Sequence, residues 1–122
     1  MLSLGEFTLE QAENRSRQFI GDIILDGRRH VSIIGVGNGP LSAALAALHA
    51  IVDGALTIRE YSEHSIGEGT GALAASYVEL LYELPGSKKT HGWGVASDTD
   101  ITGSGIKAVL TAVSKIGVVI NA

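Results

Sequence analysis

An internal duplication limits the folds open to this chain more than any other feature of its sequence. When the sequence is laid over itself 60 positions apart, Arg28-Arg29 falls on Lys88-Lys89 and Gly37-Asn38-Gly39 falls on Ser97-Asp98-Thr99. Each basic pair precedes a β-rich run, and each turn precedes an apolar run with helical spacing. Such self-similarity is typical of two copies of one supersecondary unit. We therefore expect the second half to repeat the fold of the first.

The first half reads as three strands. Residues 19–25 and 28–36 are β-rich runs separated by Asp26-Gly27. An Asp-Gly pair between apolar runs predicts an antiparallel hairpin, because both central residues of a type I′ turn need a positive φ. The alternation of apolar and polar residues over 7–13 predicts an earlier third strand.

A helix over residues 39–53 is expected to close this half. Leucines recur there at helical spacing, Pro40 stands where a first helical residue tolerates proline, and Gly54 follows the run. The first unit is therefore predicted to be βββα.

The second half is predicted to follow the same plan. Residues 56–66 look extended and residues 68–71 read as a turn. Residues 72–84 fit a helix face as well as a strand. The repeat favours a strand, because the matching segment 19–25 is a predicted hairpin strand. A short strand over 90–97 and a helix over 100–115 complete the unit, with Asp98 or Asp100 as N-cap and Gly117 as the stop.

The fold class expected is α+β, with two βββα units forming mostly antiparallel sheet and helices on one face. Residues 1–122 make one domain, with a pseudo-repeat of 1–54 and 55–117. A chain of this size buries enough surface for a core without disulfides or zinc.

Composition excludes several classes of function. A net charge of −4 argues against nucleic acid or an anionic membrane as partner, and the chain has no cysteine. Neither a signal peptide nor an apolar run of about 18 residues is present, so we expect a soluble, cytoplasmic protein. A mean hydropathy of +0.26 with 18% charged residues predicts burial against a second copy or a neighbouring domain.

The glycine-rich turn at Gly35 to Pro40 is the most unusual local feature. A helix start offers free N–H groups and the positive end of its dipole, so a carboxylate or phosphate could bind there. A plain tight turn between strand and helix explains the same residues equally well. The glycine spacing does not match the dinucleotide-binding fingerprint, and no Lys-Ser/Thr pair follows as in a P-loop.

Candidates for catalysis are few. The four histidines lack the spacing of a metal site, and we interpret them as surface or packed side chains. Glu60 and Glu63 lie near Tyr61, but on a strand the two carboxylates point to opposite faces and form a solvated edge. We expect no catalytic residue, metal or cofactor in this domain.

A binding module fits these residues better. Small side chains at Ala43, Ala44, Ala72 and Ala74 would leave room for a compact apolar group. The glycine turn would receive a carboxylate. An amphipathic small molecule such as an amino acid satisfies both conditions.

Three segments, residues 30–48, 59–80 and 91–116, resemble in order and spacing the regulatory domain at the C-terminal end of 2-isopropylmalate synthase. The GNGP turn, the YxEH segment and the WGV segment together carry the resemblance. It implies a homodimerising domain that binds L-leucine or a related branched-chain amino acid and inhibits a catalytic barrel domain that condenses acetyl-CoA with 2-oxoisovalerate.

The resemblance also implies a paired βββα fold and an effector site near the dimer interface. The matching positions are Gly37, Asn38, Gly39, Leu41, Ser42, Ser65, Ala72, Ser97 and Thr99. A chain of 122 residues has no room for a barrel of about 250 residues, so we expect a non-catalytic fragment of the larger enzyme.

Two departures keep alternatives open. Gly69-Thr70-Gly71-Ala72 stands where the family commonly has Gly-Asp-Asp-Ala, and Ser97 puts a hydroxyl where an apolar residue often covers the effector. A citramalate synthase domain that senses isoleucine is one alternative, and a dimerisation module without effector is another. A small free-standing enzyme that holds a phosphorylated substrate at the glycine turn is a third.

Overall fold

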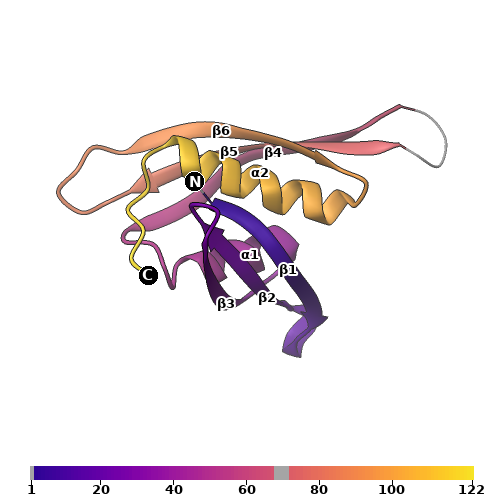
Figure 1. Ribbon diagram of the computed structural model, residues 1–122, viewed down its shortest axis with the longest axis horizontal. Helices are drawn as coiled ribbons and strands as arrows, with labels where there is room; N and C mark the ends of the chain where they lie inside the picture. The colour runs from indigo at the N-terminus through magenta and orange to yellow at the C-terminus, as the bar shows by residue number, and fades with distance from the viewer. Residues whose placement is uncertain (1, 68–71) are drawn as a thin grey trace.

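The computed structural model describes residues 2–67 and 72–122 and arranges them as two βββα units (Figure 1). In chain order the elements are β1 (Leu2–Gln11), the 3-10 helix η1 (Glu13–Arg15), β2 (Arg17–Leu25), β3 (Arg29–Gly37), α1 (Pro40–Leu48), β4 (Ala55–Ile66), β5 (Leu73–Glu83), β6 (Thr90–Asp98) and α2 (Ile101–Lys115). The turn predicted at 68–71 lies outside the described residues. The α+β fold class is confirmed.

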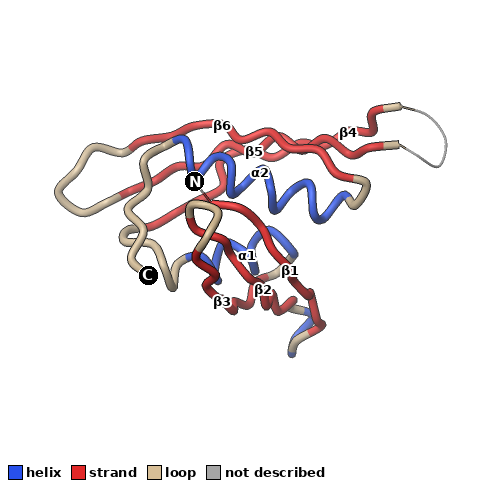
Figure 2. Tube along the Cα trace, viewed as in Figure 1, coloured by secondary structure: helices blue, strands red, loops and turns tan. Residues whose placement is uncertain are grey.

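Each unit forms its own three-stranded antiparallel sheet, in the order β1-β2-β3 and β4-β5-β6. Helices α1 and α2 lie on the sides of the sheets that face each other, as Figure 2 shows by colour. The hairpin between β2 and β3 turns at Asp26 and Gly27, whose φ angles are 51° and 73°. Both φ angles are positive, as the type I′ turn predicted from Asp-Gly requires.

The duplication extends to details of the sheets. β3 and β6 have the same burial pattern, which aligns Arg29 with Thr90, one position beyond the offset of 60. On the outer faces, His30 Nδ1 lies 2.5 Å from Asp22 Oδ2, and His91 Nδ1 lies 3.1 Å from Glu79 Oε2. These two pairs occupy matching places on their sheets.

The second unit follows the sequence prediction closely. β5 is a strand, as the repeat required, although its residues also fit a helix face. Asp100 caps α2 by accepting a 3.1 Å hydrogen bond from the Gly103 amide. Beyond the helix, Gly117 takes a φ of 70°, which ends the helix in the left-handed conformation.

The prediction for α1 was too long, because the helix ends at Leu48 instead of residue 53. The chain then turns, and Val52 forms a β-bridge with Ile120 while the Asn121 amide donates to the Ile51 carbonyl at 2.7 Å. His49 caps this turn by accepting a 3.0 Å hydrogen bond from the Leu56 amide. Pairing with distant residues thus replaces the last helical turn.

β1 also differs from its prediction. The strand begins at Leu2 and ends at Gln11, whereas the alternation predicted residues 7–13. A bulge between Leu4 and Phe7 interrupts the alternation of inward and outward residues in the first half of the strand. The sequence therefore shows no regular two-residue period there, and the start of the strand was not predicted.

Both helices contact their own sheet at a glycine. A Cβ built on Gly35 would lie 2.2 Å from the Ala47 amide nitrogen of α1, and one on Gly94 would lie 2.0 Å from the Ala108 carbonyl oxygen of α2. The helix backbone therefore rests directly on the strand. Around these contacts the two units share one core, which includes Phe19, Leu48, Leu80, Ile106 and Leu110.

Gly35→Ala is expected to destabilise the fold, because the new methyl group meets helix backbone that cannot move alone. We expect a loss of about 1–3 kcal/mol in the free energy of unfolding, measured by urea denaturation. Ser32→Ala on the exposed face of the same strand is the control and should change stability by no more than about 0.5 kcal/mol. Equal stability of the two variants would contradict the close contact.

Candidate functional site

A cleft of about 220 Å³ opens where the two units meet. It is smaller than the roughly 300–1,000 Å³ usual for drug-sized ligands, so it suits a smaller molecule. The start of α1, the inner face of β4 and the start of α2 supply its lining residues, which are Pro40, Leu41, Tyr61, Glu63, Ile101 and Thr102.

One wall of the cleft is polar. Tyr61 and Glu63 lie on the same side of β4, and the Tyr61 hydroxyl donates a hydrogen bond to Glu63 Oε2. Burial, followed by the neighbouring Glu63 carboxylate, raises the pKa of Tyr61. Our interpretation of Glu63 as part of a solvated edge was therefore incomplete, since this carboxylate lines a cleft.

The back of the cleft depends on small residues of α2. A Cβ built on Gly105 would lie 2.9 Å from Leu41 Cδ2 and 3.5 Å from the Tyr61 hydroxyl oxygen. Nearby, the buried hydroxyls of Ser76 on β5 and Ser104 on α2 are 2.6 Å apart. This hydrogen bond ties α2 to the strand behind the cleft.

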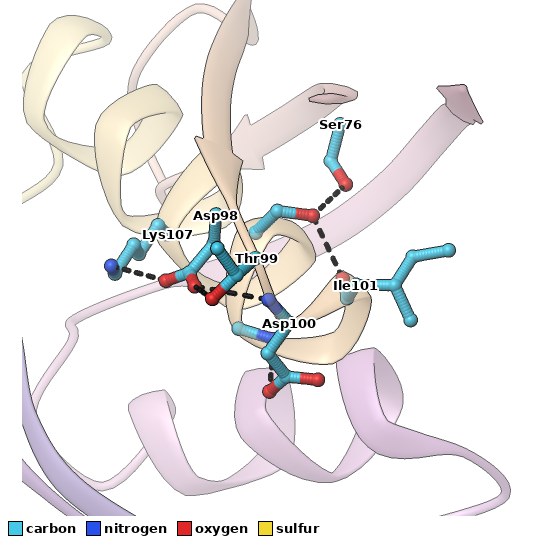
Figure 3. Close-up of polar contacts among 8 residues, drawn as sticks. Ser76, Asp98, Thr99, Asp100, Ile101 and Lys107 are labelled. Carbon is cyan, nitrogen blue, oxygen red and sulfur yellow. Dashed lines mark hydrogen bonds and ion pairs between the residues drawn. The ribbon is translucent and has the colours of Figure 1, made fainter. Parts of the chain in front are cut away.

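The N-terminus of α2 already holds carboxylates (Figure 3). Asp100 caps the helix, and Asp98 accepts a 3.0 Å hydrogen bond from the Asp100 amide. Asp98 also lies 2.5 Å from Lys107 Nζ. The Lys107 ammonium, together with the Asp100 amide, lowers the pKa of Asp98 to about 2. This helix end thus has its negative charge supplied by the chain itself.

The N-terminus of α1 is different. Among the described residues no side chain caps it, its first turn has no acidic residue, and Gly39 stands at the cap. Gly39 has an extended φ of −155°, and open space lies where its Cβ would be, so neither backbone strain nor crowding requires glycine there. Pro40 has no N–H and the Ala43 amide donates to the Gly39 carbonyl, so the Leu41 and Ser42 amides are the ones in this first turn without an intrahelical acceptor.

The structure brings together only some of the residues predicted for an effector site. Leu41 lines the cleft, Gly39 lies directly before α1, and Ser42 lies in its first turn. Gly37 has a packing role, because a Cβ there would lie 2.6 Å from the Ala43 amide nitrogen. Asn38 is exposed in the turn between them.

The other predicted residues are farther from the cleft wall. Ser97 is exposed on the outer face of β6, and Thr99 donates a 3.3 Å hydrogen bond to Asp98. Ser65 and Ala72 lie farther along the hairpin of β4 and β5, which projects beyond the helices in Figure 1. None of these four lines the cleft.

The structure places two alanines differently from the sequence prediction. Ala43 and Ala44 were expected to leave room for a ligand, but both are buried in the core beneath the first sheet. The lining residues that the sequence analysis did not select are Pro40, Tyr61, Glu63, Ile101 and Thr102. The YxEH segment in the sequence marked Tyr61 and Glu63, but no local pattern indicated that they meet α1.

The described part of the chain offers neither a cluster of metal-binding side chains nor a helix that could span a membrane. Within residues 2–67 and 72–122, no group of three or more His, Asp or Glu side chains could hold a metal ion. Neither helix in the same residues is long and apolar enough to cross a membrane.

The comparisons with known proteins all point to one family. The family model described as the LeuA allosteric (dimerisation) domain matches residues 1–117. A 2-isopropylmalate synthase of Schizosaccharomyces pombe is 39% identical over 118 residues, covering 93% of this chain and 19% of the relative. Enzymes of the same name from Saccharomyces cerevisiae and Mesorhizobium japonicum are 32% and 34% identical, with coverage of 94% and 93% of this chain and 19% of each relative. The chain thus spans about a fifth of the length of these relatives.

Asp98→Asn is expected to reduce stability at neutral pH and to remove part of the acid sensitivity. Because the folded-state pKa of Asp98 lies below its ordinary value of 3.8, its contribution is complete above about pH 4 and is lost as the pH falls towards 2. We expect a difference of about 1–2 kcal/mol at pH 7, after allowance for solvent screening, that shrinks below pH 4. Denaturation at several pH values measures it, and a pH-independent difference would refute the assignment.

Proposed function

This chain belongs to the family of LeuA allosteric (dimerisation) domains, and from that premise we propose that its cleft binds an amino acid that regulates a 2-isopropylmalate synthase. L-Leucine is the first candidate, because it is the product of the biosynthesis to which that enzyme commits carbon. The catalytic barrel domain of the enzyme and a second copy of this chain are the proposed partners.

The uncapped N-terminus of α1 is the observation that carries this proposal. The carboxylate of an amino acid would accept hydrogen bonds from the first amides of α1, where the helix dipole favours negative charge. Its ammonium group would pair with Glu63, which lines the same cleft. An aliphatic side chain would contact Leu41 and Ile101. The cleft therefore has a complementary group for each part of a branched-chain amino acid.

Regulation would follow from the position of the cleft between the two units. A ligand there contacts α1 of the first unit and both β4 and α2 of the second. If it binds one relative arrangement of the units or subunits more tightly, it shifts the population towards that arrangement. The catalytic barrel would respond only to that difference in affinity, since equal binding to both arrangements shifts nothing.

A dimerisation module without effector is the second candidate. It is favoured by Gly35 and Gly37, whose lack of a side chain is fully explained by helix packing. On this view the glycine-rich turn serves the fold alone. An isoleucine-sensing domain of a citramalate synthase remains a further alternative, because the aliphatic contacts do not distinguish the two side chains.

Calorimetric titration of the purified chain with leucine, isoleucine and valine tests the proposal. We expect binding heat with at least one of them, strongest with leucine, and an increase in melting temperature. At a ligand concentration of 100 times Kd the free energy of unfolding should rise by about 2.7 kcal/mol. A chain that dimerises without binding any of the three would support the second candidate and refute the effector proposal.

Gly39→Asp separates the role of α1 in binding from its role in folding. An aspartate at the cap should keep or slightly raise stability, by a few tenths of a kcal/mol, because it is a good N-cap. Its carboxylate would occupy the place of the ligand carboxylate, so we expect affinity for the amino acid to fall by at least about tenfold, or about 1.4 kcal/mol. Gly39→Ser, a cap without charge, is the control in the same titration. Unchanged affinity in Gly39→Asp would exclude α1 as the carboxylate site.

A further inference from the structure

We propose that two copies of this chain join along β6, whose free edge pairs antiparallel with β6 of a second copy. The two three-stranded sheets would then form one six-stranded sheet. This inference rests on the proposed dimerisation and assigns a surface to it.

The edges of the two sheets are not equally protected against pairing. Each sheet has two edge strands, which are β1 and β3 in the first and β4 and β6 in the second. β1 and β4 both contain a bulge, between Leu4 and Phe7 and between Ile58 and Glu60. Bulges twist an edge away from a flat approach, and charged side chains on an edge further oppose pairing.

The edge strands also differ in the charged side chains that they carry. β1 carries two glutamates, and β4 carries Arg59, Glu60 and Glu63. By contrast, β6 pairs with β5 without any shift in register and has no Lys, Arg, Asp or Glu between Thr90 and Ser97. An exposed, regular and uncharged edge is the kind that joins another strand.

Side chains next to this edge support the same surface. Trp93 and Val95 point outward from β6 and are 43% and 49% exposed. Val95 lies opposite Tyr77, whose ring stacks on His64, so an apolar row crosses this outer face. Tryptophan and tyrosine are common in the centres of protein interfaces, where they contribute much of the binding energy.

β3 is the matching edge of the first sheet, and it is also regular. Its outward side chains Ile34 and Val36 are 56% and 50% exposed, but no Phe, Tyr or Trp stands among the outward residues of this strand. Arg29 also begins the strand. We therefore favour β6 as the edge that pairs, and β3 provides a natural control.

A second copy is the occupant that fits β6 best. In a twofold contact both copies present the same surface, so residues close to the axis lie near their own counterparts, and fixed charges there would repel each other. The uncharged run of β6 avoids this repulsion, and Asp98 at its end is neutralised within the chain by Lys107. The family model also describes a dimerisation domain.

Charge substitutions on the two edges test the proposal. Val95→Lys places an ammonium group of each copy at the proposed contact and removes apolar burial, so the dissociation constant of the dimer should rise at least tenfold. Ile34→Lys, at the matching position of β3, should leave the dimer intact. Sedimentation equilibrium over a range of protein concentrations measures both, and circular dichroism checks that each variant is folded.

Each outcome has a distinct meaning. If the unmodified chain is a monomer, the proposed dimerisation fails and this inference fails with it. If the unmodified chain is a dimer that Ile34→Lys dissociates and Val95→Lys does not, the edge assignment alone is overturned. Dimers unaffected by either change also overturn it.

Spin labels provide a measurement that requires no loss of stability. The chain has no cysteine, so Val95→Cys and Ile34→Cys each introduce a single labelling position. We expect the distance between the two labels of a dimer to be clearly shorter for position 95 than for position 34. A shorter distance at position 34 would place the contact on β3 and refute the proposal for β6.

Discussion

The contact of each helix backbone with its own sheet is the constraint on which this structure depends. Gly35 lets α1 rest on β3, and Gly94 lets α2 rest on β6, at distances that no side chain would permit. This contact fixes each helix relative to the strand that precedes it and brings both helices into the space between the sheets. The starts of α1 and α2 then lie close enough to share a cleft with Tyr61 and Glu63.

Most of the fold could be predicted from local sequence signals and the duplication. Asp26-Gly27 predicted the first hairpin, Asp100 predicted the start of α2, and comparison of the halves resolved β5 as a strand. The end of α1 could not be predicted, because Ile51 and Val52 keep the helical period while their backbones pair with residues near the C-terminus. Such pairing joins residues far apart in the sequence and leaves no local pattern.

Less of the candidate site could be predicted. The glycine-rich turn was visible, but the sequence could not show that Gly35 and Gly37 serve packing whereas Gly39 faces open space. Glu63 shares its face of β4 with Tyr61, and whether that face is solvated or lines a cleft depends on Leu41 from the other unit and on Gly105 of α2. Contacts between the two units therefore decided the part of the site that local reasoning missed.

The aromatic pair of the first sheet has a consequence for how many ligands one chain can hold. By strand register, Phe7 and Phe19 stand where the second sheet has Tyr61 and Ser76, and their rings stack with centroids 5.8 Å apart. The first sheet thus has two stacked phenyl rings at the positions where the second has a phenol and a serine hydroxyl. On the proposed function, the cleft lined by Tyr61 would hold one amino acid, and the residues at the matching positions of the first sheet would not form an equivalent site, so one chain would bind one ligand.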